Sequence, residues 1–164
     1  MKRVLSILLV ALLSLGLFAA CDRPLTKYPV PSADEFATGF FDVIANVEEG
    51  TAGASLKLAK AAVQAAQFAQ DTNVANIDQE TMRANMLEAY TNVLKPAQQK
   101  SFDTNFLRVM DFLKSAHEDY DSVAGVLEDA GVKEAFDKLM AQDNAWANWE
   151  SLAGNVLTLG NSES

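Results

Sequence analysis

Residues 102–120 read FDTNFLRVMDFLKSAHEDY, and this stretch has the clearest helical pattern in the chain. At 100° per residue its apolar side chains fall within about 120° of one another, whereas Asp103, Asp111 and Glu118 face away from them. A helix with one apolar side must bury that side, so we expect this helix to pack in a bundle. The side chains of its predicted inner face are Phe102, Phe106, Val109, Met110, Leu113, Ala116, His117 and Tyr120.

Residues 54–70 predict a second helix, in which polar side chains occupy only a thin strip. Nearly every other position is Ala, Leu, Val or Phe, which is typical of a helix covered on most sides. We therefore expect it at the centre of the bundle, where its alanines permit close approach. The alternative is a surface helix with an exposed apolar flank that a partner covers. The strip consists of Lys57, Lys60, Gln64, Gln67 and Asp71.

Helical periodicity recurs in five further segments of the chain. Their predicted bounds are 32 to about 50, 79–95, 122–130, 132–142 and 144–158. Ser32 and Asp78 are expected N-caps, Gly131 is an expected left-handed cap, and Pro96 marks a break. The predicted inward positions of 79–95 are Met82, Met86, Tyr90, Val93 and Leu94.

No strand pattern accompanies these helices, because apolar–polar alternation stays short and no Asn-Gly or Asp-Gly hairpin signal occurs. The sequence therefore predicts an all-α protein, a helical bundle of six or seven helices. We expect one domain over residues 32–159, followed by a flexible tail at 160–164.

The first 21 residues differ from the rest. Lys2 and Arg3 precede an apolar block over 4–18, and residues 18–21 read FAAC. Such a block spans roughly 22 Å as a helix, short of a ~30 Å bilayer core, so it favours a cleaved signal over a transmembrane segment. The bulky residue, the two alanines and the only cysteine resemble the lipobox of bacterial lipoproteins.

This resemblance implies that residues 1–20 are removed and that Cys21 carries lipid on its sulfur, with a further acyl chain such as palmitate on its amine. Two or three chains anchor a protein stably, because each buried methylene contributes ~0.8 kcal/mol. The implied location is the bacterial cell envelope, facing the periplasm or the exterior. The alternative is a secreted protein with an unpaired cysteine. Residues 21–31 then comprise the lipidated cysteine and a proline-rich, extended tether of roughly 30 Å.

The chain is acidic. Without Lys2 and Arg3 it carries 22 acidic and 11 basic side chains, a formal charge of −11. A surface of this sign repels phosphate backbones and anionic lipid head groups. We therefore expect no nucleic-acid partner, and we expect acyl chains rather than a basic patch to hold the protein at a membrane.

Catalytic and metal-binding patterns are weak. His117 and Asp121 lie four residues apart and could reach one cation, but no second histidine or free cysteine completes a zinc site. The alternative is a buried or half-buried His117 that hydrogen-bonds to a neighbour. Carboxylate pairs such as Glu48-Glu49 suit solvated helix ends, and no phosphate loop or nucleophile elbow occurs. We predict no enzymatic activity, no cofactor and no metal.

Apolar side chains supply a further candidate site. Phe41, Leu87, Leu107 and Phe112 fall off the main stripes of their helices, so they either widen the core or line a groove. Methionines would make a cavity between helices adaptable. Spacing favours the core for most of these residues. The candidate ligand-binding residues are Phe41, Met82, Met86, Phe112, Trp146 and Trp149.

Two functions follow. The first is a non-enzymatic, membrane-anchored envelope lipoprotein whose bundle is a protein-interaction or structural module, with another envelope protein as its partner. The second is a lipoprotein that binds a small apolar, lipid-like molecule between its helices. A metal-dependent enzyme around His117 is a third and weaker hypothesis, because so few ligands are available.

Overall fold

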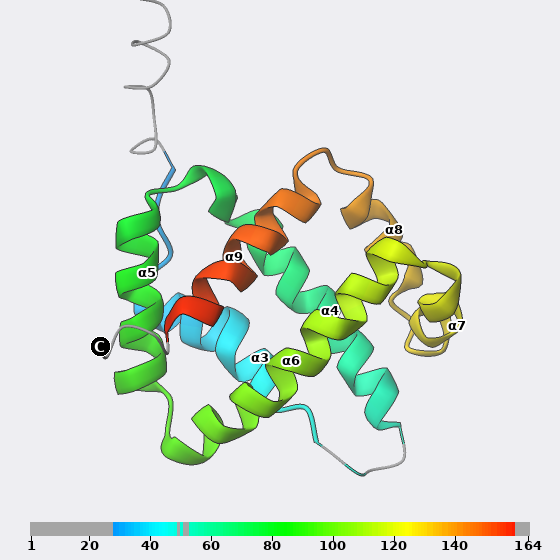
Figure 1. Ribbon diagram of the computed structural model, residues 1–164, viewed down its shortest axis with the longest axis horizontal. Coiled ribbons are helices and arrows are strands. Elements are labelled where there is room, and N and C mark those ends of the chain that lie inside the picture. The colour runs from blue at the N-terminus through cyan, green and yellow to red at the C-terminus, as the bar shows by residue number, and fades with distance from the viewer. Residues whose placement is uncertain (1–27, 49, 51–52, 160–164) are drawn as a thin grey trace, which may run out of the picture.

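The computed structural model describes residues 28–48, 50 and 53–159, and within them every regular element is helical (Figure 1). The predicted signal, Cys21, most of the tether and the tail lie outside the described residues. The prediction of an all-α bundle is confirmed. The elements are α2 (Ala33–Phe36), η1 (Ala37–Phe41), α3 (Asp42–Ala45), α4 (Ala54–Asp71), η2 (Val74–Asn76), α5 (Gln79–Glu88), η3 (Ala89–Val93), α6 (Pro96–Glu118), α7 (Asp121–Asp129), α8 (Lys133–Met140) and α9 (Ala145–Leu159).

The predicted helix ends are mostly confirmed. Ser32 caps α2, because its Oγ accepts from the Glu35 amide at 3.3 Å while the Glu35 carboxylate accepts from the Ser32 amide at 2.8 Å. Asp78 caps α5, and Gly131 follows α7 with a φ of +72°. Pro96 is the first residue of α6, where its missing amide proton costs nothing.

The first helix ends at Ala45, five residues before the predicted end near Gly50. Asn105, which is 2% exposed and lies on α6, holds the chain just beyond this end. Its side-chain amide donates to the carbonyl oxygens of Ile44 at 3.0 Å and Val47 at 2.8 Å. The Ile44 carbonyl also accepts from the Val47 amide at 3.2 Å, so both carbonyl groups at this end are satisfied.

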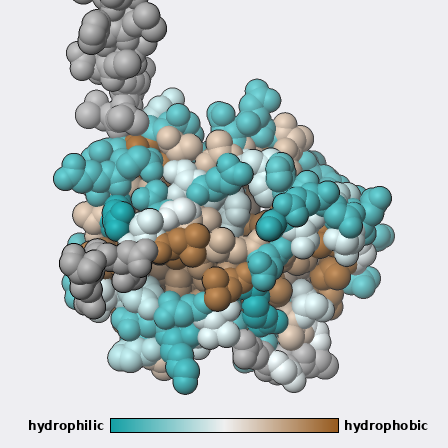
Figure 2. Space-filling view, in the orientation of Figure 1, coloured by the Kyte–Doolittle hydropathy of each residue, from teal (hydrophilic) through white to brown (hydrophobic). Residues whose placement is uncertain are grey.

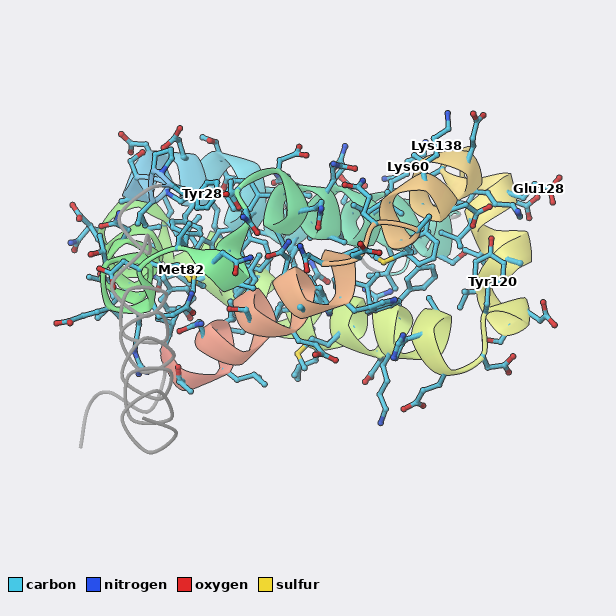
Figure 3. All side chains as sticks on the ribbon, turned by 90° about the horizontal axis from the view of Figure 1, so that it is seen from above. Tyr28, Lys60, Met82, Tyr120, Glu128 and Lys138 are labelled. Carbon is cyan, nitrogen blue, oxygen red and sulfur yellow. The ribbon has the colours of Figure 1, made fainter. Side chains whose placement is uncertain are left out.

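α4 lies at the centre of the bundle, as predicted, and packs against α3, α6, α7, α8 and α9. Seven of its side chains are buried, six of them alanines, so the neighbouring backbones come close. In the view from above, α6 and α9 lie in one layer, and α4 lies in a second layer on the side away from the viewer of Figure 1 (Figure 3). Met82 on α5 marks one end of the molecule, and Tyr120 marks the opposite end.

Two π-helical turns, η1 and η3, contact each other next to an aromatic cluster. The ring of Phe41 in η1 lies 4.8 Å from Phe102 and 6.0 Å from Tyr90 in η3, measured between centroids. Val93, predicted to face inward, ends η3 and is 42% exposed, so that prediction is wrong. The wider π turn changes which side chains face the core, and a 100° pattern cannot show this.

The segment before the first helix is also held. The side-chain amide of Asn85 on α5 donates to the carbonyl oxygen of Pro31 at 2.8 Å.

Across the described residues, no helix is both long enough and apolar enough to cross a membrane.

Candidate binding groove between α6 and α9

α6 and α9 run side by side on the face seen in Figure 1, and each packs on α4. Two hollows of about 470 and 430 Å³ lie along these helices and share Leu157. We call them together the α6–α9 groove. The larger hollow is lined by Leu87, Tyr90, Thr91, Phe102, Asp103, Phe106, Leu107, Val156, Leu157 and Leu159. The smaller hollow is lined by Met110, Asp111, Lys114, His117, Glu118, Trp146, Trp149, Glu150, Ala153, Gly154 and Leu157.

Apolar side chains are exposed along this groove. Leu107 is 57% exposed and Leu157 is 50% exposed, while Met110 and Trp146 are half-buried. Hydrophobic side chains gather over α6 and α9 in Figure 2. Single exposed apolar residues are ordinary, but a contiguous set of them marks an interaction surface or a ligand site.

The floor of the groove is fixed by aromatic packing. Trp149 is 5% exposed, and its ring lies 6.4 Å from that of Phe106, which in turn stacks on Phe102 at 5.3 Å. Asn148, beside Trp149, is fully buried. Its side-chain oxygen accepts from the Ala75 amide and its nitrogen donates to Gln70, both at 2.9 Å. These bonds attach α9 to α4 and η2, so the groove is preformed.

Gly154 lies in the interior of α9 and lines the smaller hollow. It is exposed, and a Cβ atom built on it would meet no atom within 4 Å. Glycine inside a helix costs about 0.5–1 kcal/mol relative to alanine. Packing within the chain does not require it, and its missing side chain leaves the hollow deeper.

His117 lies at the wall of the smaller hollow, where its ring is 4.2 Å from that of Trp146 between centroids. It is exposed, so the expectation of a buried or half-buried histidine is wrong. At this turn of α6, Leu113 and Ala116 are buried in the core, and only the ring of His117 lies against Trp146. Among the described residues, no three His, Cys, Asp or Glu side chains come close enough to hold a metal ion.

Acidic side chains dominate the rim. Four carboxylates and one lysine line the two hollows, and Lys114 Nζ lies 4.0 Å from Glu118. Asp103 accepts from the Tyr90 hydroxyl with both carboxylate oxygens at 2.9 Å. Burial, then this bond, raises the pKa of Tyr90 to about 12. The four carboxylates belong to Asp103, Asp111, Glu118 and Glu150.

Only two of the six predicted ligand-binding residues line the α6–α9 groove. Trp146 and Trp149 line the groove. Phe41, Met82 and Met86 are fully buried core residues, because the aromatic cluster and α5 packing enclose them, and Phe112 packs partly buried against the core. Leu87 and Leu107, noted for falling off their stripes, line the groove, whereas Leu157 and Gly154 carried no distinguishing sequence signal.

Comparison of the chain with protein-family models, with curated proteins and with solved structures finds no match.

Proposed function

We propose that the protein is a non-enzymatic lipoprotein of the bacterial envelope whose helical bundle binds another protein through the α6–α9 groove. The observation that carries this proposal is that the exposed side chains of Leu107 and Leu157 and the half-buried Trp146 line two hollows that share Leu157. Burial of apolar surface against a partner contributes roughly 25 cal/mol of binding free energy per Å² of apolar area. The lipobox-like residues 18–21 supply the proposed anchor.

The shape of the groove supports a protein partner. Among the described residues, neither hollow is an enclosed cavity, and Leu157 lines both of them. A site for a small apolar molecule usually encloses 70–90% of its ligand. Two adjoining open hollows instead suit successive side chains of one partner segment.

A small apolar ligand is the second candidate, because the smaller hollow combines Met110, Trp146 and Trp149 at a volume of about 430 Å³. Native mass spectrometry of the purified protein separates the two. A co-purifying lipid-like molecule that is lost in Trp146→Ala favours the second candidate. An unliganded mass favours the first.

The anchor is tested by growing cells with radiolabelled palmitate. The wild-type chain should be labelled and found with the membranes, and Cys21→Ala should lose both properties, because no other cysteine can take the lipid. An unlabelled wild-type chain would contradict the lipoprotein proposal.

The partner is tested by photocrosslinking in intact cells. A photoreactive residue at Leu107 or Leu157 should capture a specific neighbour. The same residue at Val93, which is 42% exposed but outside both hollows, is the matched control. Identical crosslinking at all three positions, or none at the first two, would contradict binding through this groove.

A further inference from the structure

We infer that the occupant of the α6–α9 groove is an amphipathic helix of a partner protein, with basic residues flanking its apolar face. This inference rests on the proposed function and specifies the partner segment that the groove accepts. Three features carry it: the length of the groove, the open position at Gly154 and the charge of the rim.

The groove has the length of a short helix. Its α6 side runs from Phe102 to Glu118, and its α9 side from Trp146 to Leu159. At 1.5 Å per residue these spans are roughly 24 and 20 Å, which correspond to about four helical turns. A helix laid along them presents side chains at i, i+3 or i+4, and i+7. These can enter the hollows on either side of Leu157.

Gly154 allows the partner backbone to come close. It is exposed in the interior of α9, lines the smaller hollow and has no atom within 4 Å of its Cβ position. A missing side chain at a helix–helix contact lets the two axes approach and increases van der Waals contact. Gly125 on α7 is equally exposed and open but lies outside both hollows, so it provides a matched control.

The rim selects the charge of the partner. The charged side chains that line the hollows include one lysine, Lys114, whose Nζ lies 4.0 Å from Glu118, and four carboxylates, those of Asp103, Asp111, Glu118 and Glu150. A cationic flank gains attraction from these carboxylates and is steered toward them. A second copy of the chain has a formal charge of −9 and the same acidic rim, so the charge opposes self-association through this face. Anionic lipid head groups are repelled for the same reason.

The test uses synthetic peptides of about 18 residues, enough for five turns. The probe has Leu at i, i+3, i+4 and i+7 positions and Lys elsewhere. One comparator replaces each Lys with Glu, and the other scrambles the order of the Leu/Lys peptide. The protein has two tryptophans, Trp146 and Trp149, and both line the groove, so indole fluorescence reports binding directly. The Leu/Lys peptide should bind saturably at one per chain, at least about tenfold more tightly than either comparator.

Groove variants then locate the peptide. Gly154→Leu should fill the smaller hollow and weaken binding of the Leu/Lys peptide at least about tenfold, whereas Gly125→Leu should leave it unchanged. Leu157→Asn should also weaken binding, while Val93→Asn should not. Circular dichroism checks that each variant folds, and Gly154→Ala, which adds one methyl group, serves if Gly154→Leu does not fold.

Several outcomes would overturn the inference. Equal binding of the Leu/Lys and Leu/Glu peptides would show that the charge of the rim does not select the partner. Unchanged binding of the Leu/Lys peptide to every groove variant would show that it does not bind in the groove. Groove-dependent binding to phosphatidylglycerol vesicles would identify lipid instead, and a dimer lost in Leu157→Asn would identify a second copy. Crosslinking through Leu107 and Leu157 without binding of the Leu/Lys peptide would overturn this inference and leave the proposed function standing.

Discussion

Gly39 lies directly against the ring of Phe68, so close that a Cβ atom on Gly39 would come within 2.5 Å of Phe68 Cε2. The contact joins the π-helical turn η1 to α4. The ring of Phe68 is half-buried, packs edge-on against Phe36 at 5.6 Å and stacks with Phe40 at 6.4 Å between centroids. Glycine at position 39 therefore lets the first helix come close to the central one.

We predict that Gly39→Ala lowers the free energy of unfolding by about 1–3 kcal/mol, because the added methyl group overpacks the contact with Phe68. Chemical denaturation of the purified protein measures this change. Gly125→Ala is the control, since nothing lies within 4 Å of its Cβ position. A Gly39→Ala variant as stable as the wild type would show that the ring of Phe68 moves aside freely.

Gly154→Ala should have the opposite effect. The position is helical, has no neighbour within 4 Å of its Cβ and has no positive φ, so alanine should stabilise the fold by about 0.5–1 kcal/mol. Gly125→Ala should give a similar gain on α7. The same denaturation experiment compares them, and a loss of stability in Gly154→Ala alone would mean that the groove is narrower than described.

Asn148→Ala should lower the free energy of unfolding by about 1–3 kcal/mol, because it leaves the Ala75 amide and the Gln70 side chain without their buried partner. It should also change the fluorescence of the neighbouring Trp149. Asn92→Ala, at an exposed position, should change neither property. A stable variant with unchanged fluorescence would show that α9 is positioned by its apolar contacts alone.

Stability should fall at high pH partly because of Tyr90. Its folded pKa, about 12, lies above its ordinary value of 10, so the native state favours the protonated phenol. That contribution is complete below pH 10 and is lost as the pH rises through 12. Phenolate absorbance should show a late step from Tyr90 that Tyr90→Phe removes, while Tyr120, whose pKa is also raised by its hydrogen bond to Asp137, still titrates in the variant. Titration of Tyr90 at its ordinary value would contradict the hydrogen bond to Asp103.

Helix positions were predictable because they depend on local signals. The stripe of 102–120 and the caps Ser32, Asp78 and Gly131 act within a turn or two of the residues they organise. The end of the first helix was not predictable from local signals, because the carbonyl groups there bond to Asn105, which is 58 residues from Val47 in sequence. The exposure of Val93 depends in the same way on a π turn that forms in tertiary context.

The groove was predictable only in part. Trp146 and Trp149 were candidates as large aromatic residues on one face, and Leu107 was noted because it falls off its stripe. Leu157 follows Val156, which is buried, but is itself 50% exposed, and nothing in the sequence marked it as part of a groove. Phe41 was a candidate because 100° spacing puts it off the apolar stripe that contains Phe40, whereas η1 buries both rings, so Phe41 widens the core.

The bond between Asn85 and Pro31 determines where tension enters the bundle. Tyr28 is the first described residue, and the chain from it reaches Pro31 before the first helix begins at Ala33. A force applied at Tyr28 therefore acts on α5, through Asn85, before it acts on the first helix. The strain is then shared with α5, whose Arg83 donates to the Thr158 carbonyl near the end of α9 at 2.8 Å. Mechanical load from an anchored end would thus be spread over two helices rather than unwinding one.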